Sequence, residues 1–228
     1  MKNPLKTLTK FEYILWGVSL ITVFCSYFFS SEQSVISLIS SLVGVSALIF
    51  VSAGNVLGQA LTVVFAVLYG IVSFQLRYYG EMITYLAMTA PMAICALVSW
   101  IKHPYKDKNV VEVGTVSKKQ GVFLFVSSIF VTVAFYFILG AFNTANLIVS
   151  TVSVLTSFVA SALTFLRSPF YALAYALNDI VLIVLWVLAS IQDVRYLPMI
   201  FCFVMFLIND LYGFFNWSRM RKHQSMPD

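Results

Sequence analysis

The sequence predicts an all-α integral membrane protein with about eight transmembrane helices. Of its 228 residues, 61% are hydrophobic and only 10% are charged, whereas a soluble domain carries roughly a quarter charged residues. The apolar runs continue for about 20 residues, which is the length of a helix that crosses a bilayer. They lack the period-two alternation that marks the strands of a membrane barrel. Composition and run length together exclude a water-soluble domain.

Eight apolar stretches follow one another along the chain, each bounded by polar or charged residues. The spans are expected at 11–29, 34–53, 56–76, 81–101, 120–139, 144–166, 170–190 and 196–217. The first stretch has no small-residue cleavage site before the polar residues that follow it, so it is expected to be a retained helix and not a cleaved signal. Pro91 and Pro198 are expected to bend or start their helices.

The positions of Lys and Arg predict how the spans are oriented. Twelve basic residues fall on one side of the membrane, and only Arg77 and Arg195 fall on the other. The twelve are Lys2, Lys6, Lys10, Lys102, Lys106, Lys108, Lys118, Lys119, Arg167, Arg219, Arg221 and Lys222. This excess predicts a multi-pass membrane protein with both termini in the cytoplasm. Because the basic residues are accounted for as topology signals, no nucleic-acid partner is expected.

A shift of 117 residues aligns two parts of the chain. It places Tyr69 over Trp186, Trp100 over Trp217 and Tyr79 over Tyr196, and the span boundaries coincide. The expected organisation is a tail and extra helix at 1–33, a first three-helix repeat at 34–101, a loop and linker helix at 102–143, a second repeat at 144–217 and a basic tail at 218–228. Parallel repeats of this kind are a transporter design with the substrate site between the repeats. Trp100 and Trp217, at span ends, are expected to be interfacial anchors.

Ionisable residues at membrane depth usually face an internal cavity. Asp179 and Asp210 each follow an asparagine within a span, and no intramembrane Lys or Arg neutralises them. Their neighbours at helical spacing, together with residues of one polar stripe in the first repeat, complete the candidate substrate-binding set. The set is Gln59, Tyr69, Tyr175, Asn178, Asp179, Trp186, Asn209, Asp210, Tyr212 and Asn216. Amides would donate hydrogen bonds, rings would stack, and the aspartates would bind hydroxyls or a positive ring. The alternative for each polar residue is a hydrogen bond between helices.

Chemistry of other kinds has little support in the sequence. The three cysteines, Cys25, Cys95 and Cys202, lie in apolar runs without paired spacing or histidine neighbours, so neither a disulfide nor a metal site is expected. No cluster of catalytic residues is present, and no cofactor is expected. These observations favour a transporter of a neutral or cationic small molecule over an enzyme.

Several segments resemble PnuC-type vitamin transporters over about residues 34–220. They are Asn55 to Gln59, Tyr69, Gly80 to Met82, Pro91, Trp100, Asn178 to Trp186, and Ile208 to Trp217. The resemblance implies a core of three, one and three helices similar to SWEET sugar transporters. It also implies uptake of a vitamin precursor or nucleoside by alternating access without ion coupling, with a cytoplasmic kinase trapping the solute by phosphorylation. The family's best-known substrate is nicotinamide riboside, and relatives carry thiamine, riboflavin or deoxyribonucleosides.

Two departures from the family pattern bear on the substrate. Where nicotinamide riboside transporters typically have Trp-x-x-Trp, this chain has Tyr171 and Ala174, and Ala93 stands where a glutamine is common. A deoxyribonucleoside therefore competes with nicotinamide riboside as the expected solute. Two further alternatives are a proton-coupled transporter of thiamine or riboflavin that uses Asp179 or Asp210, and an integral membrane enzyme. A homo-oligomer also remains open.

Overall fold

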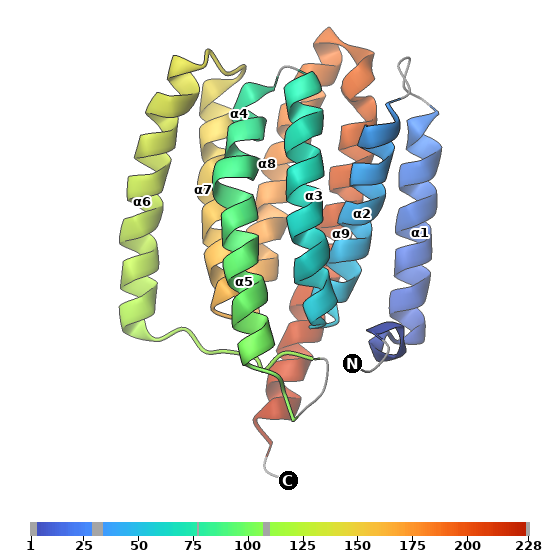
Figure 1. Ribbon diagram of the computed structural model, residues 1–228, viewed down its shortest axis with the longest axis vertical. Helices are drawn as coiled ribbons and strands as arrows, with labels where there is room; N and C mark the ends of the chain where they lie inside the picture. Colours follow the sequence, from blue (N-terminus) through green and yellow to red (C-terminus); the bar gives the residue numbers. More distant parts are fainter. Residues whose placement is uncertain (1–3, 29–33, 77, 107–109, 227–228) are drawn as a thin grey trace.

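The computed structural model describes residues 4–28, 34–76, 78–106 and 110–226. Eight long helices of the described residues stand side by side in one bundle (Figure 1), so the all-α prediction is confirmed, with seven of the eight expected spans long and apolar enough to cross a membrane. The long helices are α1 (Lys10–Tyr27), α2 (Val35–Ser52), α3 (Val56–Gln75), α4 with η2 and α5 (Tyr79–Lys102), α6 (Lys118–Ala141), α7 (Leu147–Phe165), α8 (Phe170–Gln192) and α9 (Leu197–Gln224). Short 3₁₀ turns, η1 (Pro4–Thr7) and η3 (Val194–Tyr196), precede α1 and α9. Within the described residues, all long helices but α1 are apolar enough to cross a membrane.

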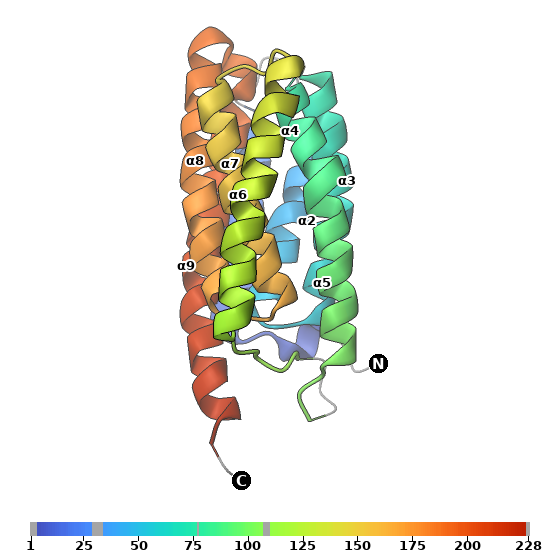
Figure 2. The same ribbon diagram turned by 90° about the vertical axis from the view of Figure 1, so that its left-hand side faces the viewer.

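Both chain ends lie at the same end of the bundle, which is called the terminal end below (Figures 1 and 2). Most of the basic residues that predict the topology lie at this end. Lys2, Arg77 and Lys108, and the side chain of Arg195, lie outside the described residues. The basic residues expected in a separate tail instead extend the last helix, because α9 continues to Gln224.

Helix α6 stands at one edge of the bundle and α1 at the other (Figure 1). Large apolar side chains cover the outside of α6, where Phe123, Phe130 and Phe137 recur every seven residues and are more than two-thirds exposed. Seven residues are about two helical turns, so these rings form one stripe. Water would penalise such a stripe, and a lipid environment would not. The outer surface thus fits a chain that lies within a bilayer.

Local sequence signals fix where several helices begin. Thr9 and Glu12 form a reciprocal capping box at the start of α1, and Ser117 and Gln120 form another at the start of α6. Each box satisfies two backbone N–H groups that have no partner inside the helix. Asn55 caps α3 through its side-chain oxygen after a turn at Gly54, whose positive φ of 70° suits glycine.

The fourth span is interrupted in its middle. Helix α4 (Tyr79–Ile83) passes into the π-helical segment η2 (Thr84–Thr89), and α5 (Ala90–Lys102) then begins with Pro91 in its first turn. Proline lacks an N–H and its ring clashes with the carbonyl one turn earlier, so a wider π-turn relieves the strain. The expected effect of Pro91 is confirmed. As a result, η2 turns Tyr85 and Thr89 toward the bundle interior, where both are buried.

Trp100 and Trp217 pack against each other at the terminal end of the core. Both side chains are fully buried, so the expectation that they anchor the protein at the membrane interface is wrong. Their ring centroids lie 5.2 Å apart. Trp100 Nε1 donates to the carbonyl of Thr164, and Trp217 Nε1 donates to that of Val51, at 3.0 and 2.9 Å. Buried indole N–H groups need such partners, and here they join α5 to α7 and α9 to α2.

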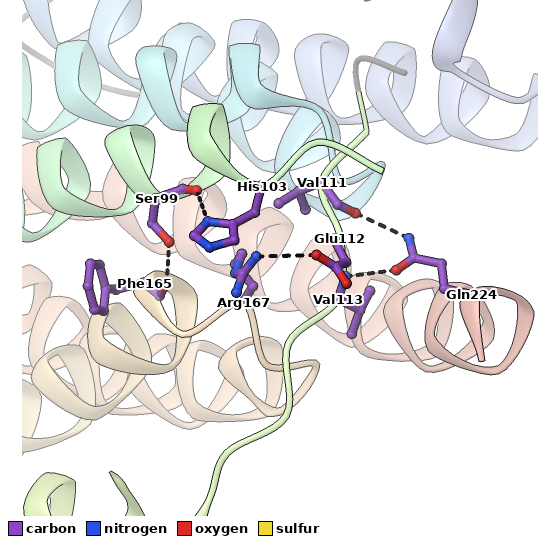
Figure 3. Close-up of polar contacts among 8 residues, drawn as sticks. All are labelled: Ser99, His103, Val111, Glu112, Val113, Phe165, Arg167 and Gln224. Carbon is purple, nitrogen blue, oxygen red and sulfur yellow. Dashed lines mark hydrogen bonds and ion pairs between the residues drawn. The ribbon is translucent and has the colours of Figure 1, made fainter. Parts of the chain in front are cut away.

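The segment between α5 and α6, described over 103–106 and 110–117, crosses the terminal end and is called the belt (Figure 3). The Gln224 side chain at the end of α9 receives a hydrogen bond from Val113 N and donates one to Val111 O. Glu112 lies 3.9 Å from Arg167 Nη1 in the α7–α8 turn. Burial lowers the pKa of Arg167, and the nearby Glu112 carboxylate partly opposes this. The belt therefore attaches to α9 and the α7–α8 turn together.

Candidate functional site

A small cavity with both polar and apolar walls lies inside the bundle between α2, α3, η2, α7, α8 and α9. Five residues of the predicted set line it together, namely Gln59, Tyr175, Asn178, Asp179 and Asp210. Its volume is about 50 Å³, which holds a few water molecules but is well below the roughly 300 Å³ of a small ligand pocket. The structure therefore shows the site closed around its polar groups. A nucleoside-sized ligand would have to move side chains to enter.

Two carboxyl groups line this cavity from neighbouring helices. Asp179 of α8 and Asp210 of α9 are both almost fully buried. Asp179 Oδ2 is buried and lacks a hydrogen-bond partner. Among the described residues that line the cavity, none is Lys, Arg or His.

Asn178 is held from one side by hydroxyl groups of α7. Its Oδ1 accepts hydrogen bonds from Thr156 and Ser157 at 2.8 and 3.0 Å. These bonds fix the amide plane and leave its NH₂ group to donate toward the cavity. Tyr175 is positioned in the same way, since its hydroxyl lies 3.0 Å from Ser161 Oγ. Helix α7 thus orients two cavity residues of α8.

Aromatic rings close the cavity on the side away from the terminal end. Phe65 packs edge-on against Tyr85 and Phe206, with centroids 5.9 and 5.3 Å apart. Gly44 of α2 leaves room for this cluster, because a Cβ there would lie 2.5 Å from Phe206 Cζ. Phe203 extends the cluster toward Tyr69, at 5.8 Å. The rings separate the cavity from the outside and offer it apolar faces.

Tyr69 and Trp186 lie within this aromatic layer and not on the cavity wall. Trp186 Nε1 donates to Tyr69 Oη at 3.0 Å. Both side chains are almost fully buried. Tyr69 also packs against Tyr85, at 4.3 Å between ring centroids. The structure therefore brings these two predicted residues next to the site, where they pack behind Tyr85 and do not line the cavity.

Beyond the aromatic layer, a polar vestibule of about 470 Å³ opens at the end opposite the termini. It lies between α1, α2, α3 and α9, and its polar side chains include Ser37, Ser41 and Gln75. Along α3 the cavity residues end at Phe65 and the vestibule begins at Val72. Seven residues of helix span about 10 Å. One layer of side chains therefore separates the vestibule from the cavity.

The other three predicted residues, Asn209, Tyr212 and Asn216, face α1. Asn209 Nδ2 donates to Ser19 Oγ at 3.0 Å and to Met205 O at 2.7 Å. Asn216 Nδ2 donates to Ser52 O at 2.9 Å and lies 3.4 Å from Glu12 Oε1. Their spacing of three and four residues correctly placed them on one face of α9. That face packs against the extra helix and does not line the cavity.

Tyr212 completes this α1–α9 contact, because its ring lies 5.0 Å from that of Phe11. The same helix thus presents Asp210 to the cavity and Asn209 to α1. Sequence spacing alone does not say which of the two faces meets a ligand.

Sequence reasoning missed several cavity residues. They are Phe65, Tyr85, Thr89, Ser157, Phe203 and Phe206. Phe65, Phe203 and Phe206 look like ordinary lipid-facing or core residues in an apolar run, and no sequence signal separates them. Tyr85 and Thr89 did carry a signal, because they precede Pro91 within two turns, and π-turns next to proline often occur at functional sites. Thr89 Oγ1 is buried in the cavity wall without a hydrogen-bond partner.

Comparison with known proteins places this geometry in a family. The family model described as nicotinamide mononucleotide transporter matches residues 34–219. The chain is 24% identical over 222 residues to the nicotinamide riboside transporter PnuC of Neisseria mucosa, covering 95% of this chain and 84% of that protein. The crystal structure described as the vitamin B3 transporter PnuC superposes with a TM-score of 0.82 at 24% identity, covering 96% of this chain and 94% of the other.

The family model covers more than half of the chain, and the superposed structure has the same fold. The proteins matched are membrane transporters and not enzymes. The helical bundle and the sequence match agree, and the chain belongs to the nicotinamide mononucleotide transporter family, that is, to the PnuC-type transporters.

Proposed function

We propose that this protein takes up a nucleoside-like vitamin precursor, either nicotinamide riboside or a (deoxy)ribonucleoside, by facilitated diffusion. The observation that carries the proposal is the closed cavity, in which amide, hydroxyl and carboxyl groups lie beside aromatic rings. Amides and carboxyls suit ribose hydroxyls, and the rings suit a flat heterocycle. The relative from Neisseria mucosa is described as a nicotinamide riboside transporter, which supports this solute.

The charge of the cavity favours a nucleoside over its phosphate ester. Asp179 and Asp210 supply negative charge, and the described lining residues include no base to bind a phosphate. A phosphate group would repel the carboxylates and lose its water without compensation. The pyridinium ring of nicotinamide riboside carries a positive charge, which carboxylates and aromatic faces both attract. The site therefore fits the dephosphorylated form.

The three positions that differ from the family pattern do not supply the cavity with rings. Tyr171 is fully buried against Trp217, at 4.9 Å between ring centroids, and Ala174 and Ala93 are small and buried. Phe65, Tyr85, Phe203 and Phe206 provide the apolar surface instead. This arrangement keeps both candidate solutes, because these rings can stack on a pyridinium and on a purine or pyrimidine.

We propose alternating access between two three-helix units, 34–101 and 144–217, joined by the linker region 102–143. The 117-residue shift aligns Tyr69 with Trp186 and Trp100 with Trp217, and each residue contacts its own counterpart. Equivalent residues near a two-fold axis meet in this way. Transport would require the Trp100–Trp217 contact to open toward the cytoplasm while the aromatic layer stays closed. Residues 1–33 and 218–228 lie outside the two units.

The orientation follows from charge. The terminal end carries most of the basic residues, so we place it in the cytoplasm of a bacterial cell and the vestibule outside. A cytoplasmic kinase would then retain the solute as its phosphate. A second mode, coupled to protons, has one observation in its favour, which is the presence of two buried aspartates, Asp179 and Asp210, in the cavity wall.

Uptake by proteoliposomes tests the proposal. The purified protein should equilibrate labelled nicotinamide riboside or deoxyribonucleosides with no ion gradient, while liposomes without protein should not. Uptake that requires an imposed pH gradient would favour the proton-coupled mode. Failure to carry any nucleoside, with or without a gradient, would overturn the proposal.

A further inference from the structure

A further pocket, of about 410 Å³, lies at the terminal end of the bundle. Its walls come from the end of α5, the α7–α8 turn, the belt and the start of α6. The volume is within the range of pockets that hold small ligands, roughly 300–1,000 Å³. Among the described residues, its lining shares no member with the internal cavity or the vestibule. The proposed transport path therefore gives this pocket no role.

Arg167 is the basic group of this pocket whose donors lack acceptors. Its side chain is 17% exposed, and within the described residues its Nε and Nη1 atoms are buried without a hydrogen-bond partner. Glu112 Oε2 lies 3.9 Å from Nη1, which is longer than a hydrogen bond. Buried polar groups in native structures are nearly always paired. An anion with two oxygens would supply the acceptors that the guanidinium fork needs.

The backbone holds Arg167 in a conformation that favours glycine. Its φ is 57°, and its N–H donates to the carbonyl of Thr164 while the N–H of Ser168 donates to that of Leu163. This motif ends many helices, and its left-handed position is usually a glycine because a Cβ is disfavoured there. An arginine at such a position indicates that its side chain has a use.

Two more side chains offer donors to the same pocket (Figure 3). His103 Nδ1 lies 2.8 Å from the carbonyl oxygen of Ser99, which can only accept, so Nδ1 carries the hydrogen and Nε2 is the nitrogen that remains for a ligand. Gln120 Oε1 accepts from the Ser117 N–H in the capping box, which leaves its NH₂ group to donate. The pocket thus combines a guanidinium with neutral donors on other segments.

The surroundings of the pocket carry an excess of positive charge. Lys102 ends α5, and Lys118 and Lys119 begin α6, next to lining residues in the chain, and all three are exposed. Within the described lining, Glu112 is the single acid, and its side chain is 59% exposed. Such a distribution attracts anions. A cationic or neutral solute gains nothing from it.

We propose that this pocket binds a phosphate monoester, with Arg167 as its principal ligand, and that the bound anion keeps the terminal end closed. The pocket spans α5 of the first unit and the α7–α8 turn of the second. Ser99 Oγ donates to Phe165 O at 2.9 Å across this junction. Trp100 Nε1 donates to Thr164 O at 3.0 Å beside it. An anion that contacts both units favours the state in which they touch.

This inference rests on the proposed function, in which the terminal end is cytoplasmic and the solute is retained there as its phosphate. The phosphate monoester of the solute is the product of that phosphorylation, so its accumulation would slow further uptake. The headgroup of phosphatidic acid has the same chemistry and reaches this end of the bundle from the membrane. A terminal phosphate is common to both sources, and the experiments below separate them.

Calorimetric titration of the full-length protein in neutral detergent tests the site. The probes are inorganic phosphate and nicotinamide mononucleotide, and nicotinamide riboside is the control ligand. Arg167→Gly should weaken binding of both probes at least about tenfold, because a charge-assisted bidentate contact is lost. Binding of nicotinamide riboside should not change. The melting temperature should stay the same or rise, because glycine suits the positive φ.

Two further variants refine this titration. Arg221→Gln removes an exposed basic residue at the same end but outside the pocket, and it should leave binding of both probes unchanged. Glu112→Gln removes the negative charge beside Arg167 and should tighten binding by up to about fivefold. Equal binding of the probes by the wild-type protein and Arg167→Gly would overturn the site for soluble phosphates.

Uptake of the labelled solute into proteoliposomes tests the closing effect. Nicotinamide mononucleotide on both sides of the membrane should lower the initial rate of the wild-type protein and leave Arg167→Gly much less affected. Competition in the internal cavity would instead inhibit both proteins equally, and that result would overturn the closing effect.

Liposomes that contain phosphatidic acid, compared with liposomes of phosphatidylcholine alone, test the lipid source. If the headgroup occupies the pocket, phosphatidic acid should slow the wild-type protein and not Arg167→Gly, without any nucleotide. If Arg167→Gly matched the wild-type protein in the titration and in both kinds of liposome, the inference would fail alone. If the wild-type protein carried no nucleoside, the proposed function would fail, and the titration would still decide whether the pocket binds a phosphate.

Discussion

The chain contains the dipeptide Asn-Asp twice, on neighbouring helices, and the structure treats the two copies differently. Both aspartates, Asp179 and Asp210, face the same cavity. Asn178 lines that cavity too, held by hydroxyls of α7, whereas Asn209 bonds to Ser19 of α1. The difference shows that the helix packed against a polar residue, and not the residue type, decides whether a buried amide meets a ligand or joins two helices.

The first test of this comparison is Asn178→Ala. Loss of the donor on the cavity wall should lower uptake of the solute about 10- to 100-fold, because a ligand hydrogen bond at a buried site contributes about 1–3 kcal/mol. Initial uptake rates in proteoliposomes at several solute concentrations would measure the change. Uptake unaltered within twofold would remove Asn178 from the site.

The second test concerns the contact between α1 and α9, to which Asn209 belongs. Glu12→Ala removes both the Thr9 N–H acceptor of the capping box and the carboxylate next to Asn216. We expect a loss of about 1–2 kcal/mol of stability, or roughly 2–8 °C in melting temperature. Thermal unfolding in detergent would measure it. Thr9→Ala, which removes only the cap, should cost less, and an equal or larger loss would contradict the role given to the α1–α9 contact.

Asn209→Ala is the matched partner of Asn178→Ala. Removing its bond to Ser19 should cost about 1 kcal/mol, or about 2–4 °C in melting temperature, with the apparent KM for uptake unchanged. The same uptake and melting measurements apply. A large rise in KM with a normal melting temperature would place Asn209 in the substrate site and break the comparison.

The smallest expected effect is at the belt. Glu112→Gln removes the negative charge that lies 3.9 Å from Arg167 Nη1. The Glu112 side chain is 59% exposed. Exposed ion pairs contribute about 0–1 kcal/mol, so the melting temperature should shift by no more than a degree or two. A shift as large as that of Glu12→Ala would mean that the belt, and not the α1–α9 contact, holds this end of the bundle together.

The sequence by itself determined the number of helices, because runs of about 20 apolar residues leave the backbone few alternatives in a bilayer. It also determined that Asp179 and Asp210 lie inside the bundle, because a carboxylate in lipid is costly. Helical spacing placed Asn209, Tyr212 and Asn216 on one face of α9, which the structure confirms.

Only the tertiary structure decided what each face meets. Spacing fixes angles within a helix, whereas the neighbour that covers a face depends on contacts far apart in sequence, such as Asn209 with Ser19. The same holds for Trp100 and Trp217, whose positions at span ends resemble interfacial anchors but whose rings pack against each other in the core. It also holds for Tyr85 and Thr89, which reach the cavity because the chain takes a π-turn before Pro91. A one-dimensional pattern records the polarity of a side chain, and the packing of the other helices determines its partner.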